Sequence, residues 1–338
     1  MTRRLLLAVA AMALAPASTT MLAAPGHARP VTPVGAAAWR ADPRGLPDPV
    51  TTEPDAVRRY FAGLGDAEQR DLARTYPGVV GNLDGAPVDL RYRANAAAGH
   101  DGILGFDPRG RGRVAQVFGD LATADRIAVL VPGAGNRLGN FWRGVGGKAF
   151  RSPARQGADL FDRARASGPT ERFAVVVWLG YEPPARIDVS AAREDRAREG
   201  ALALGRFVAG LAAVRPHATV ALLGYSYGST VIGVAAPHLP PTVTDIVAVG
   251  SPGMGVDHVT RLGTTARVWA ALSRHDVMRF VPGVRFLGLG HGRQPADPAF
   301  GATVVAARDV VDHDHYLAAG VDSQATLARI ALLGRDRP

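Results

Sequence analysis

One short stretch of the sequence carries the residue types of a nucleophilic turn. The pentapeptide GYSYG places Ser226 between Gly224 and Gly228 and matches the pattern G-x-S-x-G. In that pattern a buried strand runs into the serine, a helix leaves it, and the glycines let neighbouring backbones approach closely. The apolar run 219–223 suits such a strand, and the small residues of 227–236 suit such a helix. An ordinary strand–turn–helix junction is the alternative, and this context favours a serine nucleophile over it.

A serine nucleophile needs a base and an acid that orients the base. On the fold that uses this turn, the acid follows the serine in the chain and the histidine comes last. Asp276 ends the apolar run VWAALSRHD, so its carboxylate is expected at the carboxyl edge of a sheet. Asp257, in GMGVD, is the alternative acid, although a solvated loop explains it equally well.

Two neighbouring histidines fit the role of base. His313 and His315 both lie in VVDHDHYL, beyond the acid and after the last predicted strand, and position alone does not choose between them. His291 precedes that strand, and we interpret it as a loop or structural histidine. His313 and His315 are also spaced for a metal ion, but no H-E-x-x-H motif accompanies them, so we predict neither a metal nor a cofactor.

The oxyanion hole is expected from two backbone N–H groups. One belongs to Tyr227, directly after the serine, and the other to Ala134, in the loop VPGAGNRLGNF that follows an earlier apolar run. The glycines around Ala134 do not form a nucleotide-binding loop. Lys148 is not in a G-K-[ST] context, and Leu138 stands where G-x-G-x-x-G requires glycine.

The elements that must position these residues alternate between short apolar runs and amphipathic stretches. Buried strands are expected at 126–133, 173–181, 219–226, 245–252, 267–276 and 302–309, and helices at 192–214, 227–236 and 322–333. Continuous apolar strands separated by helices predict a mostly parallel central sheet with helices on both faces of an α/β domain. Together with the turn at Ser226, this pattern favours the α/β-hydrolase fold. Upstream, we expect a helix over 54–75 that breaks near Gly63, turn residues at 81–87, and a β-hairpin from 102–108 and 113–119.

The N-terminus has the pattern of an export signal. Arg3 and Arg4 precede a ten-residue apolar stretch, and small residues offer cleavage sites after Ala17 or Ala28. We therefore predict a signal peptide over 1–28, a Pro-rich extended or disordered linker over 29–52, and one domain over 53–338 with a helical and hairpin extension at 53–120. The protein is then expected to be secreted or otherwise extracytoplasmic.

Composition narrows the classes of function. The chain has 338 residues, no cysteine and a net charge of +9, and Lys148 is its only lysine. Thiol chemistry and disulfides are excluded. The basic residues form no stripe or run, so we expect no nucleic-acid partner, while weak attraction to an anionic envelope surface stays compatible with the charge. After the N-terminal segment no apolar stretch is long enough for a transmembrane anchor.

With these residues in place, the chain resembles an exported bacterial α/β-hydrolase-like family of unknown function. The resemblance covers about 54–335 and rests on GNLDGAPVDLRYRAN, ILGFDPRGRGRVAQVFGD, VLVPGAGN, WLGYEPP, GYSYGS, GHGRQPADPAFGA and HDHYL. It implies that Ser226 is the nucleophile. The family's final His-x-x-Tyr pattern implies that His313 is the base, because Tyr316 follows it by three residues. The acid segment usually reads Asp-Pro, whereas Val277 follows Asp276 here, and the resemblance implies no substrate.

These observations predict an exported serine hydrolase that forms an acyl-enzyme, with carboxyl esters or lipids as the favoured substrates. An acyltransferase with an alcohol acceptor would use the same residues. A non-catalytic, envelope-associated binding protein on the same fold is the alternative from a different class.

Overall fold

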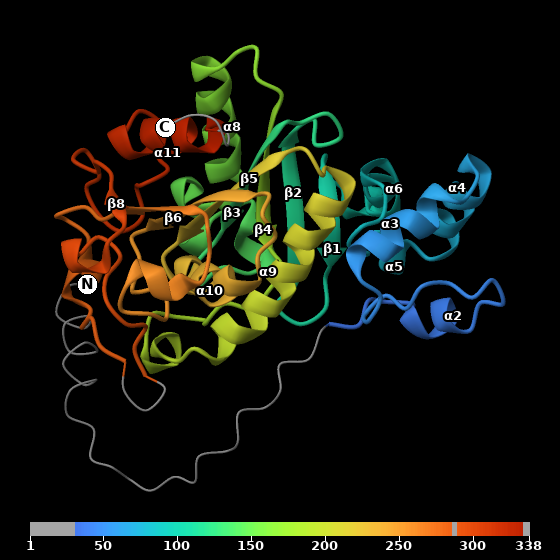
Figure 1. Cartoon of the computed structure of the whole chain (residues 1–338), viewed down its shortest axis with the longest axis horizontal. Helices are drawn as coiled ribbons and strands as arrows, with labels where there is room; N and C mark the ends of the chain where they lie inside the picture. The colour runs from blue at the N-terminus through green and yellow to red at the C-terminus, as the bar shows by residue number, and fades with distance from the viewer. Residues whose placement is uncertain (1–30, 286–288, 334–338) are drawn as a thin grey trace, which may run out of the picture.

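An eight-stranded sheet in the order β1-β2-β4-β3-β5-β6-β7-β8 forms the centre of the computed structural model (Figure 1). The structure describes residues 31–285 and 289–333, so the predicted signal peptide lies outside the described residues. The strands are β1 (Ile103–Asp107), β2 (Arg113–Gly119), β3 (Arg126–Val131), β4 (Phe173–Leu179), β5 (Thr219–Tyr225), β6 (Val243–Val249), β7 (Arg267–Ala271) and β8 (Thr303–Val304). Strands β3 to β8 pair in parallel, while β2 is antiparallel to both β1 and β4.

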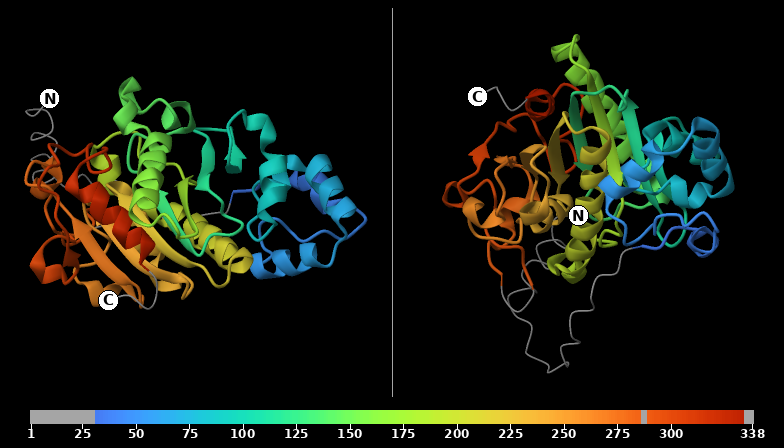
Figure 2. Two further views of the ribbon diagram at one scale, coloured as in Figure 1. Left: turned by 90° about the horizontal axis from the view of Figure 1, so that it is seen from above. Right: turned by 45° about the vertical axis from the view of Figure 1, so that its right-hand side comes forward.

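Helices cover both faces of this sheet (Figure 2). The α-helices are α2 (Ala36–Arg40), α3 (Pro54–Ala62), α4 (Asp66–Thr75), α5 (Pro77–Val80), α6 (Val88–Ala94), α7 (Leu138–Phe141), α8 (Pro153–Ser167), α9 (Asp195–Val214), α10 (Tyr227–Ala235) and α11 (Asp322–Leu332). Short 3₁₀ turns are η1 (Ala96–Ala98), η2 (Val145–Gly147), η3 (Ala149–Arg151), η4 (Val189–Ala192), η5 (Ala236–His238), η6 (Val259–Leu262), η7 (Val277–Phe280) and η8 (Pro298–Phe300).

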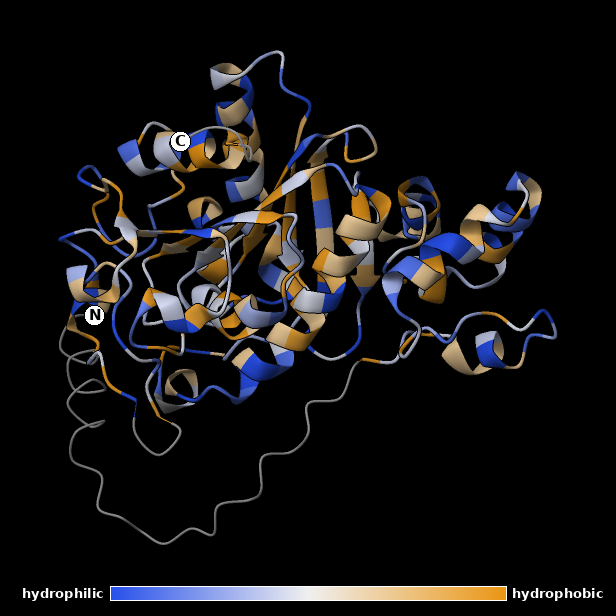
Figure 3. Ribbon diagram, in the orientation of Figure 1, coloured by the Kyte–Doolittle hydropathy of each residue, from blue (hydrophilic) through white to orange (hydrophobic). Residues whose placement is uncertain are grey.

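The two faces of the sheet bury different side chains. On β3, Ile127 and Val129 pack in the cluster that includes α9 and α10, whereas Ala128 and Leu130 pack in the cluster that includes α8 and α11. Successive side chains of a strand point to opposite faces, so a strand with helices on both sides must be apolar throughout. Figure 3 shows the central strands as the most hydrophobic part of the ribbon. The predicted α/β-hydrolase class, with its mostly parallel sheet, is thereby confirmed.

Two predicted strands end much earlier than expected. The strand expected over 267–276 ends at Ala271, so Asp276 lies on the loop beyond it. The strand expected over 302–309 is reduced to Thr303 and Val304, both of which are exposed at the edge of the sheet. An edge strand has a neighbour on one side only, and only two residue pairs join β8 to β7.

The N-terminal part of the described chain is folded onto the body. The prediction of an extended or disordered linker is wrong for residues 31–52. Trp39 is completely buried, and its indole N–H donates to the carbonyl of Pro47 at 2.7 Å. A tryptophan buries a large apolar area once its N–H has a partner, and this holds residues 31–52 against α3 to α6. The predicted break near Gly63 is confirmed, since α3 ends at Ala62 and α4 begins at Asp66.

The predicted hairpin forms, but it is part of the central sheet rather than an extension. β2 pairs with β4 over six residue pairs, from Val114–Leu179 to Gly119–Ala174. The α/β body therefore begins at β1, and the helices before it form a smaller layer beside α9 and β1 (Figure 1).

Candidate active site

The turn that carries Ser226 is a strained junction between β5 and α10. Ser226 has φ 52° and ψ −126°, and it is the one non-glycine residue with positive φ among residues 31–285 and 289–333. A Cβ on Gly224 would lie 2.5 Å from the Cα of Ser229, and one on Gly228 would lie 2.1 Å from the carbonyl oxygen of Val131. Both glycines are thus required by close backbone approach, and the turn projects Ser226 at the carboxyl edge of the sheet.

His313 connects Ser226 to Asp276. Its Nε2 lies 3.0 Å from the Oγ of Ser226, and its Nδ1 lies 2.9 Å from each carboxylate oxygen of Asp276. The Asp276 side chain has no exposed surface, and that of His313 is 12% exposed. The structure therefore brings the predicted serine, base and acid into one line of hydrogen-bonding distances, from three loops that follow β5, β7 and β8.

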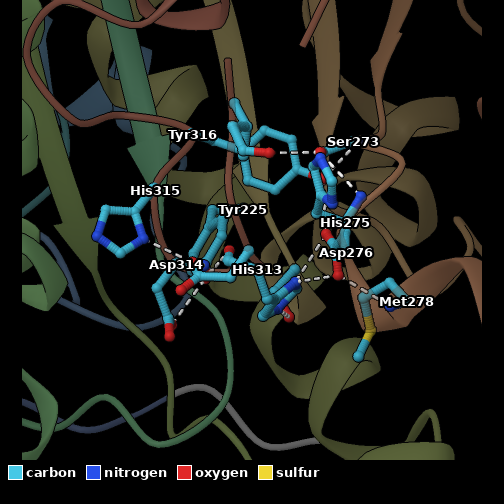
Figure 4. A network of polar contacts seen from close by, with 12 residues as sticks. Tyr225, Ser273, His275, Asp276, Met278, His313, Asp314, His315 and Tyr316 are labelled. Atoms are coloured by element: carbon cyan, nitrogen blue, oxygen red, sulfur yellow. Dashed lines mark hydrogen bonds and ion pairs between the residues drawn. The ribbon is translucent and has the colours of Figure 1, made fainter. Parts of the chain in front are cut away.

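Two further donors hold the carboxylate of Asp276 (Figure 4). The backbone N–H of Met278 donates to one oxygen at 2.8 Å, and the hydroxyl of Tyr316 donates to the other at 2.6 Å. Burial raises the pKa of Asp276, but the hydrogen bond and charge of His313, with these two donors, outweigh it and hold the pKa below its usual value. The acid is therefore ionised and fixed opposite the imidazole.

Ser273 joins the acid loop to the histidine loop. Its backbone N–H donates to the hydroxyl of Tyr316 at 2.8 Å, and its own hydroxyl donates to the carbonyl of Val310 at 2.6 Å. Burial and the charge of Asp276 raise the pKa of Tyr316, so its phenol stays protonated and able to donate. The sequence indicated Tyr316 only through its spacing from His313, and nothing in the sequence indicated Ser273.

The predicted oxyanion loop lies against the turn. A Cβ on Gly133 would lie 2.7 Å from the Cβ of Ser226 and 3.1 Å from the backbone nitrogen of Tyr227, so the loop that contains Ala134 passes directly beside both. The loop is fixed from outside, because the hydroxyl of Tyr181 donates to the carbonyl of Pro132 at 2.6 Å. Tyr227 is fixed too, since its hydroxyl donates to the carbonyl of Arg193 at 2.7 Å.

The alternative acid and base lie elsewhere. Asp257 accepts a hydrogen bond from the backbone N–H of Arg293 at 3.1 Å, and among the described residues it has no hydrogen bond to a histidine. His315 points away from Asp276 in Figure 4, and its Nδ1 lies 2.6 Å from a carboxylate oxygen of Asp312. Its ring stacks on Phe150 with centroids 4.3 Å apart.

His291 is a buried structural histidine, in agreement with its interpretation from the sequence. Its Nε2 lies 2.6 Å from the carbonyl oxygen of Ala191, and its ring meets Tyr227 edge-on with centroids 5.5 Å apart. Burial lowers the pKa of His291, so the ring is neutral and donates from Nε2.

Glu194 is a buried acid that the sequence did not single out. Its side chain is 2% exposed and forms ion pairs with Arg198 at 3.0 Å and Arg285 at 2.8 Å. In the sequence it is one of several charged residues at the start of a helix, and nothing marks it as the buried one. The pair with Arg285 fixes the segment after β7 to the start of α9.

A cavity of about 540 Å³ lies between the N-terminal helices and the sheet, and it is not lined by Ser226, Asp276 or His313. Trp178, Tyr181 and Phe207 form apolar walls, and the ion pair between Arg91 and Asp84 closes another side. Among residues 31–285 and 289–333, no group of three or more His, Cys, Asp or Glu side chains is arranged to hold a metal ion. In the same part of the chain, no helix is long and apolar enough to cross a membrane.

Comparisons with known proteins identify a family for this chain. The family model described as alpha/beta hydrolase matches residues 107–286. An uncharacterized protein of Mycobacterium bovis, Mb0988c, is 30% identical over 262 residues, which cover 72% of this chain and 89% of that protein. The uncharacterized protein Rv2079 of Mycobacterium tuberculosis is 24% identical over 384 residues, and there the match covers 86% of this chain but only 57% of the relative.

Solved structures with a similar arrangement include the esterase PE8, with a TM-score of 0.43 and 16% identity over 64% of this chain and 97% of that one. A serine hydrolase without a lid from Xanthomonas campestris has a TM-score of 0.38 and 15% identity over 65% of this chain and 86% of that one. The family match spans the sheet from the end of β1 to the segment that carries Asp276. With the strand order and the turn at Ser226, it shows that the chain belongs to the alpha/beta hydrolase family.

Proposed function

We propose that this protein is a serine hydrolase that cleaves carboxyl esters through an acyl-enzyme. The observation that carries the proposal is the unbroken series of hydrogen-bonding distances from Ser226 through His313 to the buried Asp276. A serine with a positive φ at a glycine-flanked turn has no structural need for such a base. Membership of the hydrolase family supports the same reaction class.

In the proposed reaction, the Oγ of Ser226 attacks the acyl carbonyl while the Nε2 of His313 accepts its proton. The charge of Asp276 stabilises the imidazolium and holds the ring in the tautomer that leaves Nε2 free to accept. The backbone N–H groups of Tyr227 and Ala134 bind the oxyanion of the tetrahedral intermediate. As this intermediate collapses, His313 gives its proton to the leaving alcohol, and Ser226 remains acylated.

Water then completes the cycle. His313 removes a proton from the water as it attacks the acyl carbon, a second oxyanion forms in the same hole, and the proton passes to Ser226 as the acid is released. The same acyl-enzyme would transfer its acyl group to an alcohol if an acceptor displaced water. Export of the chain, argued from Arg3 and Arg4 and the apolar stretch after them, is part of the proposal and makes envelope esters or lipids the expected substrates.

A fluorophosphonate probe tests the nucleophile directly. The purified protein is expected to take up one probe per chain, with the adduct on Ser226 by peptide mass spectrometry, and Ser226→Ala is expected to take up none. Ser229→Ala is the matched control, because Ser229 lies in the same turn but its hydroxyl donates to the carbonyl of Ser226 and so points away from the reaction. Labelling that persists in Ser226→Ala would refute the assignment. Incubation with a p-nitrophenyl ester, with and without an added alcohol, separates hydrolysis from transfer.

A further inference from the structure

Four large apolar side chains are exposed on two loops of the catalytic edge. Phe280 and Val284 are 60% and 61% exposed, and Ile187 and Leu289 are 43% and 40% exposed. We refer to these four residues as the apolar rim. Single exposed apolar residues are ordinary on a protein surface, but several on adjoining loops mark an interaction site.

Contacts between the two loops hold the segments that carry the apolar rim against each other. Leu289 forms an isolated β-bridge with Arg193, six residues after Ile187, and the backbone N–H of Gly290 donates to the carbonyl of Ala192 at 2.8 Å. The ion pair of Arg285 with the buried Glu194 adds a third link. The two loops follow β4 and β7, and in Figure 1 they lie together at the lower edge of the view.

The apolar rim is directly connected to the candidate active site. Phe280 ends the 3₁₀ turn η7, whose residue Met278 donates its N–H to the carboxylate of Asp276. The parallel strands β4, β5 and β7 all end at the same edge of the sheet, so the loops that carry Ile187, Ser226 and Phe280 leave the sheet at that edge.

The loop after β7, which carries Phe280, Val284 and Leu289, has a positive charge. Residues 274–294 contain four arginines and one acid, and that acid is the completely buried Asp276. Arg274 and Arg279 are exposed, and within the described ranges neither forms an ion pair with a carboxylate. The guanidinium of Arg279 lies 5.4 Å from the ring centroid of Phe280, so cation and apolar ring are presented side by side.

We propose that the apolar rim docks on an anionic lipid surface and that the esters hydrolysed at Ser226 are drawn from that surface. Exposed apolar side chains beside unpaired arginines match the two components of such a surface, the acyl region and the charged headgroups. The arrangement turns the catalytic edge toward the lipid. The docking stands independently of catalysis, and only the origin of the substrate depends on the function proposed above.

Sedimentation with vesicles measures docking in protein that cannot turn over. Ser226→Ala protein is mixed with vesicles of phosphatidylglycerol or of phosphatidylcholine, and the bound fraction is measured. We expect at least about tenfold tighter binding to phosphatidylglycerol. Adding Phe280→Ser and Val284→Ser is expected to weaken that binding about tenfold or more, while Leu202→Ser, which removes an apolar side chain 56% exposed on α9, leaves it unchanged.

The arginines are tested in the same way. The double substitution Arg274→Gln with Arg279→Gln is expected to reduce the preference for phosphatidylglycerol. Arg163→Gln, at an exposed position of α8, is expected to keep that preference. With Ser226 restored, the rim variants are expected to lose more turnover on an ester embedded in vesicles than on a soluble p-nitrophenyl ester, by about tenfold. Binding without any ester turnover would refute the proposed function and leave the docking intact.

Three results would overturn the docking. One is equal binding to the two lipids. Another is vesicle binding that Phe280→Ser and Val284→Ser do not weaken. The third is a protein that binds neither lipid and forms a dimer in analytical ultracentrifugation, where these two substitutions abolish the dimer. The apolar rim would then bind a second copy of the chain.

Discussion

Two histidine–aspartate pairs use histidines that lie two residues apart in the chain, and only one of these pairs reaches Ser226. The pair of His315 with Asp312 has the shorter distance, 2.6 Å against 2.9 Å for His313 with Asp276. Its acid is 48% exposed, however, whereas the Asp276 side chain is completely buried and has two further donors. A short distance at the surface is thus a poor guide to function, and the burial and complete hydrogen bonding of the acid distinguish the pair that can act on a nucleophile.

The largest effect should come from substituting Ser226 or His313, where the pair of His313 with Asp276 meets the nucleophile. Ser226→Ala and His313→Gln are each expected to lower kcat/KM for a p-nitrophenyl ester by about 10³-fold or more, with circular dichroism unchanged. The double variant is expected to be little worse than either, because the residues act as a unit. Losses that multiply in the double variant would show that His313 does not work through Ser226.

Asp276→Asn tests the far end of the same pair. An amide in place of the carboxylate is expected to favour the wrong tautomer of His313 and to lower kcat by about 10²-fold or more, with little change in KM. Asp257→Asn serves as the control, because the hydrogen-bond partner of this acid among the described residues is the backbone N–H of Arg293. The assignment of the acid would fail if Asp257→Asn proved to be the inactive variant.

Tyr316→Phe removes one donor from Asp276 and leaves the rest of the triad in place. We expect kcat to fall by roughly 10- to 100-fold in this variant, because a hydrogen bond to a buried charge is lost. The wild-type pKa of Asp276 is held low, so the stability that this carboxylate contributes is present above its unfolded pKa and is lost as the pH falls through the folded one. The variant should raise the pKa of Asp276 toward its unfolded value, so the stability lost on acidification should be smaller and the loss should be complete at a higher pH.

Urea unfolding of wild type and Tyr316→Phe between about pH 3 and 7 measures this shift. Tyr60→Phe, on the N-terminal helices, provides a control for the loss of a tyrosine hydroxyl. An identical acid profile in Tyr316→Phe and wild type would show that the phenol does not hold the carboxylate.

The smallest effect is expected from the pair of His315 with Asp312. His315→Gln removes the stacking on Phe150 and the bond to Asp312, both outside the line from Ser226 to Asp276. We expect kcat/KM to fall by less than about tenfold, in keeping with the modest free energy of exposed pairs. If His315→Gln were inactive and His313→Gln active, the choice of base would be reversed.

The difference between the pairs also shows what the sequence can predict. Apolar runs predicted the buried strands, because a strand covered on both faces tolerates few polar residues, and the glycines around Ser226 predicted the turn. Position in the sequence could not distinguish His313 from His315, because both lie beyond the acid and after the last predicted strand. The fully buried Trp39 and the insertion of β2 beside β4 depend on distant partners, so no local pattern in residues 31–52 or 113–119 contained them.

The strand order has a consequence for how the chain acquires its structure. During synthesis β1, β2 and β3 emerge in succession, yet β2 and β3 do not pair with each other, because β4 lies between them. The second edge of β2 has no partner until residues 173–179 are made, and β3 has neighbours on both sides only when residues 219–225 arrive. Pairings over such separations are slow, and the unpaired edges of β2 and β3 are exposed to other chains meanwhile. The segment that ends at Ser226 therefore completes the centre of the sheet, and a nascent chain that stops before it has neither the nucleophile nor a closed core.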